Sequence, residues 1–241
     1  RSLPFIMKRE DIQFDKTVIG RIVKLGSPVA LQDLLVNISF LVIIAIANHM
    51  GTIPSAGVGV AEKLCGFVMM VPSAYGQSMT AFVAQNVGAS REDRARRVLL
   101  YGVLSSLAAG LVMCWGTFFH GDVLTGIFAK DTEVIAAAAE YLKAYAIDCM
   151  LTPFLFCFTG YYNGCEKTLF VMIQGIIGAF FVRIPVAYLM SRMAGATLFQ
   201  IGLSTPASSV VQILLCLFMF LFLERRSAGQ SHASLKGSAD P

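Results

Sequence analysis

The sequence predicts an all-α membrane protein with six transmembrane helices, and two observations support this fold class. Hydrophobic residues make up 56% of the 241 residues and charged residues only 14%, whereas a soluble domain carries about 25% charge. Mean hydropathy is +0.69. The apolar residues also gather in six segments, each long enough to cross a bilayer core about 30 Å thick at about 1.5 Å per helical residue. This composition excludes a soluble fold.

The six spans are expected at residues 25–47, 57–84, 98–119, 136–162, 168–191 and 198–223. The connecting stretches are short, so consecutive helices should be antiparallel neighbours. Residues 1–24 are predicted to form a cytoplasmic connector with a short amphipathic helix at the membrane surface. The tail at 224–241, rich in Ser, Ala and Gly, is predicted to be disordered. A chain that starts in a polar stretch suggests a piece of a longer polypeptide.

The distribution of Lys and Arg predicts the orientation of the spans. Fourteen of the 19 basic residues fall on the side of the two chain ends, and only Lys130 and Arg192 lie in loops on the opposite side. Cytoplasmic loops carry the excess of Lys and Arg. We therefore expect a multi-pass protein of the inner (plasma) membrane with both termini in the cytoplasm. No basic face with interleaved aromatic residues is present, so a nucleic-acid partner is not expected.

Polar residues interrupt the first span. Residues 26–28, Gly-Ser-Pro, are predicted to break its helix early, and Asp33 and Asn37 follow on one helix face. A carboxylate at this depth costs about 3 kcal/mol on insertion scales, so it should face the bundle interior or water. Asp33 could relay a proton or cation or balance a cationic substrate. Alternatively, it is simply hydrated at the membrane edge.

The second span is also predicted to be interrupted. Pro72 lies in mid-segment and removes a helix hydrogen bond, and Gln77 follows in the same apolar surroundings. Gln77 could hydrogen-bond a neighbouring helix or contact a ligand. Near the outer mouth, Glu62 and Lys63 could form an interfacial charge pair or line a vestibule. The span ends in residues 85–89, Gln-Asn-Val-Gly-Ala, followed by a loop with four arginines.

Two charged residues lie deeper in the later spans. Asp148, between Tyr145 and Thr152, lies deeper than Asp33, which favours a functional role for it. Arg183 lies deep in the fifth span and is followed by Pro185. It needs a partner, either Asp148 or a backbone carbonyl freed by the proline. The residues predicted to form a substrate or ion pathway are therefore Asp33, Asn37, Glu62, Gln77, Asp148 and Arg183.

Small residues and cysteines are interpreted as packing features. Gly160 and Gly164 form a GxxxG pattern, and Gly175 with Gly178 adds a second site where helix backbones can approach closely. The six cysteines lie in or beside apolar segments without a CxxC pair, which favours buried small side chains over disulfides or a metal site. No HExxH, GxSxG-like or paired-aspartate constellation is present, so the sequence predicts neither an enzyme nor a bound cofactor.

Four patches together resemble the MATE family, the multidrug and toxic compound extrusion transporters: IVKLGSPVALQDLL, VPSAYGQSMTAFVAQNVGASREDRARR, TGYYNGCEKTLFVMIQG and VRIPVAYLM. The second patch is the most specific. The resemblance implies twelve spans in two six-helix lobes, and this chain is similar to the C-terminal lobe, with the connector preceding it. It therefore implies an N-terminal six-helix lobe as partner, in the same or a companion polypeptide.

The resemblance also implies a function, the export of organic cations and amphipathic drugs in exchange for Na⁺ or H⁺. The carboxylates that some MATE branches carry in this lobe would fall near Val36 or Asn37 and near Thr152, and none of these is acidic. Coupling could reside in the other lobe, or Asp33 and Asp148 could perform it from shifted positions, with Asp148 the best single candidate. The alternatives are a lipid-linked oligosaccharide flippase, which would need a strongly cationic cavity, and a non-transporting fragment or assembly subunit.

Overall fold

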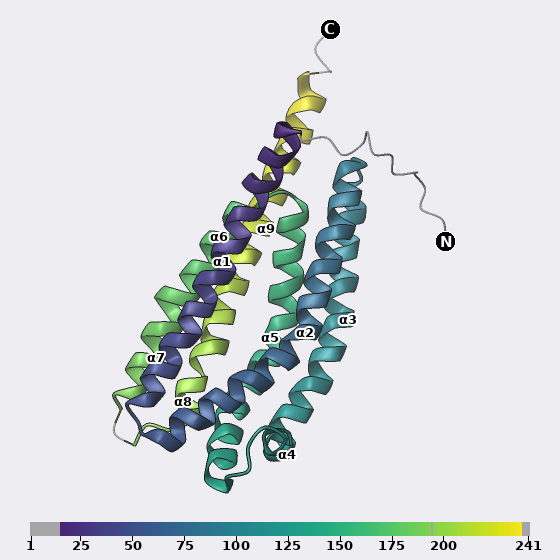
Figure 1. The fold of residues 1–241 in the computed structure, drawn as a ribbon. Helices are drawn as coiled ribbons and strands as arrows, with labels where there is room; N and C mark the ends of the chain where they lie inside the picture. The colour runs from purple at the N-terminus through teal and green to yellow at the C-terminus, as the bar shows by residue number, and fades with distance from the viewer. Residues whose placement is uncertain (1–14, 194, 238–241) are drawn as a thin grey trace, which may run out of the picture.

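The computed structural model describes residues 15–193 and 195–237 and contains helices joined by short turns throughout this part (Figure 1). Six helical stretches within it are long and apolar enough to cross a membrane, which confirms the predicted fold class. The elements are α1 (Lys16–Asn48), α2 (Thr52–Gly88), α3 (Glu92–Phe119), α4 (Gly121–Gly126), α5 (Thr132–Gly164), α6 (Thr168–Ile176), the π-helical segment η2 (Ile177–Arg183), α7 (Ile184–Ser191), α8 (Leu198–Gly202) and α9 (Ser204–Gly237).

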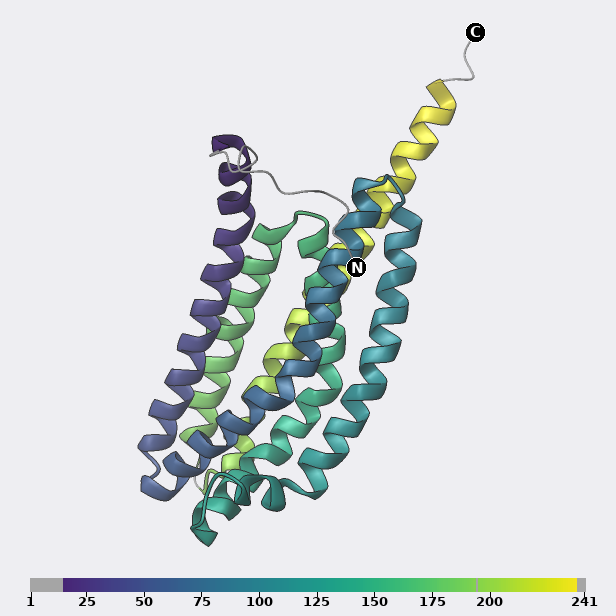
Figure 2. The same ribbon diagram turned by 45° about the vertical axis from the view of Figure 1, so that its right-hand side comes forward.

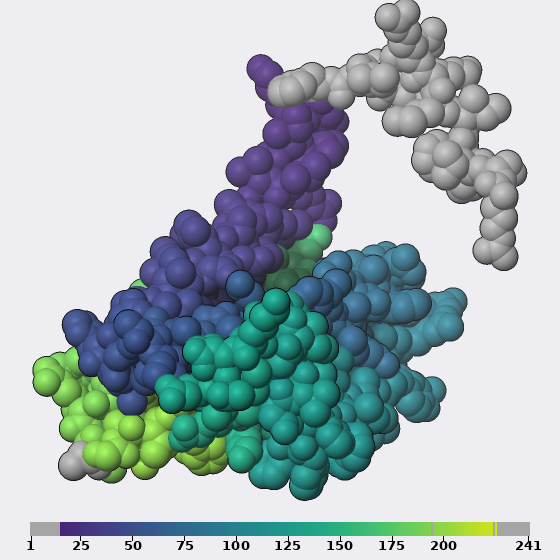
Figure 3. All heavy atoms as spheres, turned by 60° about the horizontal axis from the view of Figure 1, so that its bottom comes forward, coloured from purple at the N-terminus to yellow at the C-terminus, as the bar shows by residue number. Residues whose placement is uncertain are grey.

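The helices form an elongated bundle around α5, which packs against α2, α3, α8 and α9. The start of α1, the α2–α3 turn, the α5–α6 turn and the end of α9 lie at one end, which we call the basic end (Figure 1). An ion pair between Arg21 and Glu166 joins α1 to the α5–α6 turn there. The start of α2, the α4–α5 region and the α7–α8 region together cover the opposite end (Figure 3).

The first two helices diverge along the bundle. Helices α1 and α2 are joined at the opposite end and separate toward the basic end, where α5 and α9 lie behind the space between them (Figures 1 and 2). Helix α1 packs mainly against α6, whereas α2 packs mainly against α5. The two helices therefore belong to different packed pairs, α1 with α6 and α2 with α5.

Glycines explain how closely α2 approaches α5. A Cβ atom at Gly160 would collide with the carbonyl oxygen of Gly76, and one at Gly164 would lie 2.7 Å from the Cβ of Val83. Real Cβ atoms do not come this close to their neighbours, so only glycine allows the observed contact. The close approach predicted from the GxxxG pattern is confirmed.

Two predicted helix breaks are wrong. Helix α1 runs without interruption through Pro28, and α2 runs through Pro72. Helix α2 instead changes direction along its length (Figure 2). A proline removes one N–H and crowds the preceding turn, which bends a helix without ending it when neighbouring helices hold both halves.

The predicted ends of the bundle also differ from the structure. Residues 16–24 form the first turns of α1 rather than a separate surface helix, because the Asp15 side chain caps the helix by accepting hydrogen bonds from the amides of Thr17 and Val18 at 2.8 and 3.3 Å. These bonds lower the pKa of Asp15. Residues 1–14 of the predicted connector lie outside the described residues.

At the other end of the chain, α9 continues to Gly237, so the backbone of 224–237 is helical where disorder is predicted. Each residue added to the end of an existing helix gains one backbone hydrogen bond, so a polar segment can continue the helix. Residues 238–241 of the predicted tail lie outside the described part of the chain.

The fifth span contains a feature that the sequence analysis does not predict. Its central seven residues, Ile177–Arg183, form the π-helical segment η2, and Pro185 follows two residues later. Because Pro185 has no N–H to donate, one backbone hydrogen bond is missing where η2 passes into the α-helix α7. The π segment ends with Arg183, whose side chain is buried.

Candidate solute and ion pathway

A cavity of about 250 Å³ lies between α1, α2, α5, η2 and α9. Three of the predicted pathway residues line it, namely Asp33, Asp148 and Arg183. They come from α1, α5 and η2, so residues separated by 35 to 150 positions in the sequence meet at one site. Helix α2 contributes Met69 to the lining.

Asp148 lies on the central helix and is only 2% exposed. Its Oδ1 atom has no hydrogen-bond partner among the described residues. A buried carboxylate ordinarily needs a partner, because an uncompensated charge in a low-dielectric interior costs several kcal/mol, as a rough figure. The carboxylate also interacts with Ser209, and its free Oδ1 is chemically able to accept a proton or to contact a small cation.

Arg183 supplies the nearest opposite charge, and its guanidinium interacts electrostatically with Asp148. No ion pair joins these two described side chains directly. Instead, the Arg183 Nη1 donates a hydrogen bond to Ser39 Oγ at 3.0 Å, and the guanidinium lies over the Phe40 ring at 4.3 Å from its centroid. Its Nε has no partner among the described groups. Neither partner proposed for Arg183 from the sequence is therefore its direct hydrogen-bond acceptor.

Asp33 differs from Asp148 because its side chain is exposed while it also lines the cavity. Asn37, one turn further along α1, donates to the Asp33 backbone carbonyl at 2.7 Å and does not line the cavity. The two side chains share a helix face as predicted, but only the carboxylate contributes to the site.

Glu62 and Gln77 do not line this cavity, although Glu62 interacts electrostatically with the cavity residue Arg183. Glu62 accepts a hydrogen bond from the Tyr141 hydroxyl at 3.0 Å, and Lys63 is exposed, so the predicted Glu62–Lys63 charge pair is wrong. Gln77 is exposed and donates to Ser73 Oγ on its own helix at 3.3 Å. It therefore makes no hydrogen bond between helices in this structure.

The structure adds uncharged polar side chains that the sequence analysis does not single out as site residues. The cavity is also lined by Gln32, Thr152, Thr159, Asn163, Thr205, Ser209 and Gln212. The polar residues on α9 recur at intervals of four and three, and those on α5, counted from Asp148, at intervals of four, seven and four, so each set follows one helix face. This periodicity is the signal that could have revealed them.

Several of these polar atoms have no partner among the described residues, including Thr152 Oγ1, Asn163 Oδ1 and Thr205 Oγ1. Buried polar groups in native proteins ordinarily have a hydrogen-bond partner, so the cavity suits a polar or hydrated occupant. Carboxylate, hydroxyl and amide oxygens are also the donors that hard cations prefer. No cluster of three or more His, Cys, Asp or Glu residues suited to a metal occurs in the part of the chain that the structure describes.

Comparison with known proteins agrees with this architecture. The profile of the MatE family matches residues 28–189. The chain is 22% identical over 218 residues to the probable multidrug resistance protein YoeA of Bacillus subtilis, covering 90% of this chain and 47% of YoeA. It is 26% identical over 188 residues to the multidrug export protein MepA of Staphylococcus aureus, covering 76% and 40%. The crystal structure of a MATE protein in complex with MaL6 aligns with a TM-score of 0.80 at 13% identity, covering 94% of this chain and 50% of that one.

Proposed function

Since the chain belongs to the MATE family, a family of transporters rather than enzymes, we propose that it is the C-terminal six-helix lobe of a twelve-helix exporter. In this proposal the exporter moves amphipathic or cationic compounds outward in exchange for Na⁺ or H⁺. The chain spans about half the length of the curated relatives it matches, which are named as multidrug resistance or export proteins. The half-length match supports a companion lobe.

Exposed polar side chains on the spans support the position of that companion lobe. Asp33, Asn37 and Gln77 are exposed on α1 and α2, the two helices that diverge toward the basic end. Lipid cannot satisfy a carboxylate or an amide, so these groups need protein or water beside them. We place the N-terminal lobe against the α1–α2 side, with the solute path between the two lobes.

The single observation that carries the coupling proposal is the charge balance of the cavity. Its charged lining residues are Asp33, Asp148 and Arg183, so the ionised cavity carries a formal charge of −1. One monovalent cation or one proton neutralises it. The oligosaccharide-flippase alternative requires a strongly cationic cavity, and one arginine against two aspartates does not meet that requirement.

The orientation is part of the same proposal. The basic end carries the four arginines between positions 91 and 97 and both described ends of the chain. Under the positive-inside rule this end lies in the cytoplasm. An epitope tag fused after Pro241 should then be reached by an impermeant reagent only in permeabilised cells. Labelling of the tag in intact cells would overturn the orientation.

Dye efflux from cells expressing the complete two-lobe transporter tests the proposed function. Asp148→Asn should reduce ion-driven efflux at least tenfold at unchanged expression, because the neutral amide cannot bind and release a charge. Asp122→Asn, an exposed aspartate on α4, is the matched control and should leave efflux unchanged. Wild-type efflux by Asp148→Asn under both Na⁺ and pH gradients would contradict the coupling role, and absence of efflux by the unaltered transporter would contradict export itself.

A further inference from the structure

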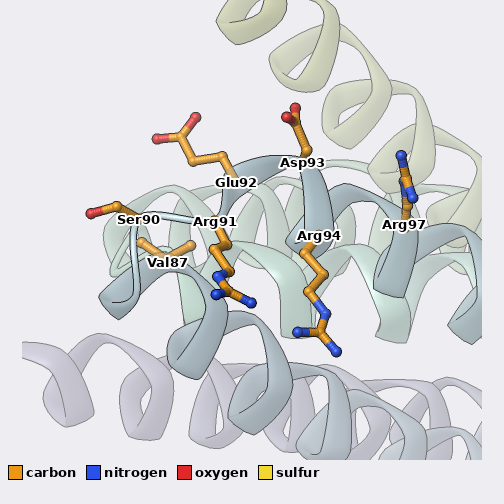
Figure 4. A pocket seen from close by; sticks show the side chains of 7 residues that line it. All are labelled: Val87, Ser90, Arg91, Glu92, Asp93, Arg94 and Arg97. Atoms are coloured by element: carbon orange, nitrogen blue, oxygen red, sulfur yellow. The ribbon is translucent and has the colours of Figure 1, made fainter.

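Glu62 is an acidic side chain of the spans that the protein itself holds in place, outside the cavity described above. It is half-buried on α2 and accepts a hydrogen bond from the Tyr141 hydroxyl of α5 at 3.0 Å. Tyr141 is completely buried. Glu92 and Asp93 at the start of α3 differ, because both are exposed and their carboxylates extend away from the α2–α3 turn (Figure 4). Water can solvate those two carboxylates, whereas Glu62 depends on a protein partner.

Ionisable side chains on one face of α5 connect Glu62 with the cavity. Tyr141, Tyr145 and Asp148 follow one another at intervals of four and three residues, so they share a helix face. Tyr145 and Asp148 both line the cavity. Because α5 runs from the opposite end toward the basic end, Tyr141 lies about 10 Å nearer the opposite end than Asp148. Glu62, bonded to Tyr141, is therefore on the side of the cavity that faces the opposite end.

Arg183 links the two carboxylates electrostatically. Its guanidinium interacts with Asp148, Tyr145, Tyr141 and Glu62. Neither carboxylate forms an ion pair with it among the described side chains, so both remain able to take a proton. Two ionised carboxylates and one guanidinium carry a formal charge of −1, and a single proton on either carboxylate neutralises the set. Moving that proton from one carboxylate to the other leaves the total charge unchanged, which avoids the cost of an additional buried charge.

The groups around Glu62 suit a proton better than a metal cation. Besides Arg183, it interacts with the hydroxyls of Tyr141 and Tyr145 and the thiol of Cys65. Helices α1, α3 and α4, which also pack against α2, contribute none of these groups. A hydroxyl can accept one proton as it donates its own, so it passes a proton on without changing its charge. Hard cations are bound by several oxygen ligands at once, which one carboxylate and one bonded hydroxyl do not supply.

We propose that Glu62 takes up the coupling proton from water at the opposite end and passes it to Asp148. This inference rests on the proposed function, in which the opposite end faces outward, and it names H⁺ as the coupling ion. In the transfer the Glu62 carboxyl group loses its proton and the Asp148 carboxylate gains one. Tyr141 and Tyr145 each accept one proton and donate one, so their charges do not change.

Two activities of the complete transporter in proteoliposomes separate this role from substrate binding, with the cationic dye ethidium as the probe. One is ethidium transport driven by a pH gradient, and the other is ethidium exchange without a gradient, which needs no net proton movement. Glu62→Gln keeps an acceptor for the Tyr141 hydroxyl but cannot titrate. It should therefore slow pH-driven transport by roughly tenfold or more and leave exchange unchanged. Glu62→Asp, which keeps a carboxylate, should transport faster than Glu62→Gln under the same gradient.

Matched variants control for the position and for the loss of a hydrogen bond. Glu133→Gln changes an exposed glutamate in the first turn of α5, at the same end of the molecule, and should leave both activities unchanged. Tyr141→Phe should slow pH-driven transport alone. Tyr162→Phe also removes one hydrogen bond from a completely buried tyrosine of α5, and it should leave the ratio of the two activities unchanged.

Three results would count against the proposal, and they differ in what else they affect. Unaltered pH-driven transport in Glu62→Gln, or equal loss of both activities in Glu62→Gln and Tyr141→Phe, would overturn the role of Glu62. An unaltered transporter that responds to a Na⁺ gradient but not to a pH gradient would also overturn it, while leaving the proposed exporter in place. Absence of both ethidium activities in the unaltered transporter would contradict the proposed function, and this inference with it.

Discussion

Gly110, at the position where α3 crosses α5, provides a direct test of the packing. A Cβ atom at this position would lie 2.6 Å from the carbonyl oxygen of Cys149 and 2.7 Å from Cγ of Pro153. Pro153 has no N–H, so it cannot hydrogen-bond the Cys149 carbonyl as a helical residue four positions later normally would. Glycine lets α3 approach this carbonyl, and Asp148 precedes Cys149 in the chain.

Gly110→Ala should therefore destabilise the protein by about 1–3 kcal/mol, the usual range for overpacking. Ordinary contact begins near 3.4 Å, so the two helices must separate locally by about 0.8 Å, and neither the backbone carbonyl nor the proline ring can move aside alone. Gly116→Ala on the same helix is the matched control, because no atom lies within 4 Å of its added Cβ. It should be neutral or stabilise by up to about 1 kcal/mol through helix propensity.

Thermal unfolding in detergent, monitored with both variants and the unaltered protein, measures this difference. Gly110→Ala should melt well below Gly116→Ala and should also lower efflux, because the displaced segment of α5 holds Asp148. Equal melting temperatures for the two variants would show that α3 and α5 do not pack as closely as described.

Two further predictions concern hydrogen bonds. The buried Tyr162 hydroxyl donates to the Cys216 carbonyl of α9 at 2.6 Å, so Tyr162→Phe should cost about 0.5–1.5 kcal/mol, the net contribution of one hydrogen bond; a variant that unfolds like the unaltered protein would contradict this. The pKa of Asp15 is lowered by its capping bonds, so the stabilisation it gives to α1 is present above the unfolded-state pKa and is lost as the pH falls through the lower folded-state pKa. Protection of the Thr17 and Val18 amides, measured as the exchange rate relative to the intrinsic rate at each pH, should therefore fall at low pH, and Asp15→Ala should lack this protection at every pH.

The number of spans could be predicted from the sequence because each span needs a long apolar run whatever its neighbours are. The start of α1 could not, since charged residues such as Lys16 and Arg21 read as a surface segment, although a helix already capped by Asp15 includes them without a break. The helix breaks predicted at Pro28 and Pro72 were wrong for a related reason. Their effect depends on whether neighbouring helices hold both sides of the bend, and that information is absent from a single segment.

The cavity could be predicted only in part. Asp33, Asp148 and Arg183 stand out because a charge in an apolar span needs a special environment. Thr205 and Ser209 do not stand out, because hydroxyls can bond to the backbone of their own helix and so are unremarkable in a span. Their role emerges only when α9 is packed against α5, which places both hydroxyl-bearing residues in the wall around Asp148.

The way Arg183 is held bears directly on ion coupling. A guanidinium bonded directly to Asp148 would compete with an incoming cation, and the ion would first have to break a buried ion pair. Here Ser39 and Phe40 hold the guanidinium instead, and Asp148 Oδ1 is left without a partner among the described residues. Arg183 therefore offsets part of the cost of a buried carboxylate without occupying it. In the proposed exporter, this arrangement lets Asp148 bind one positive charge and release it again.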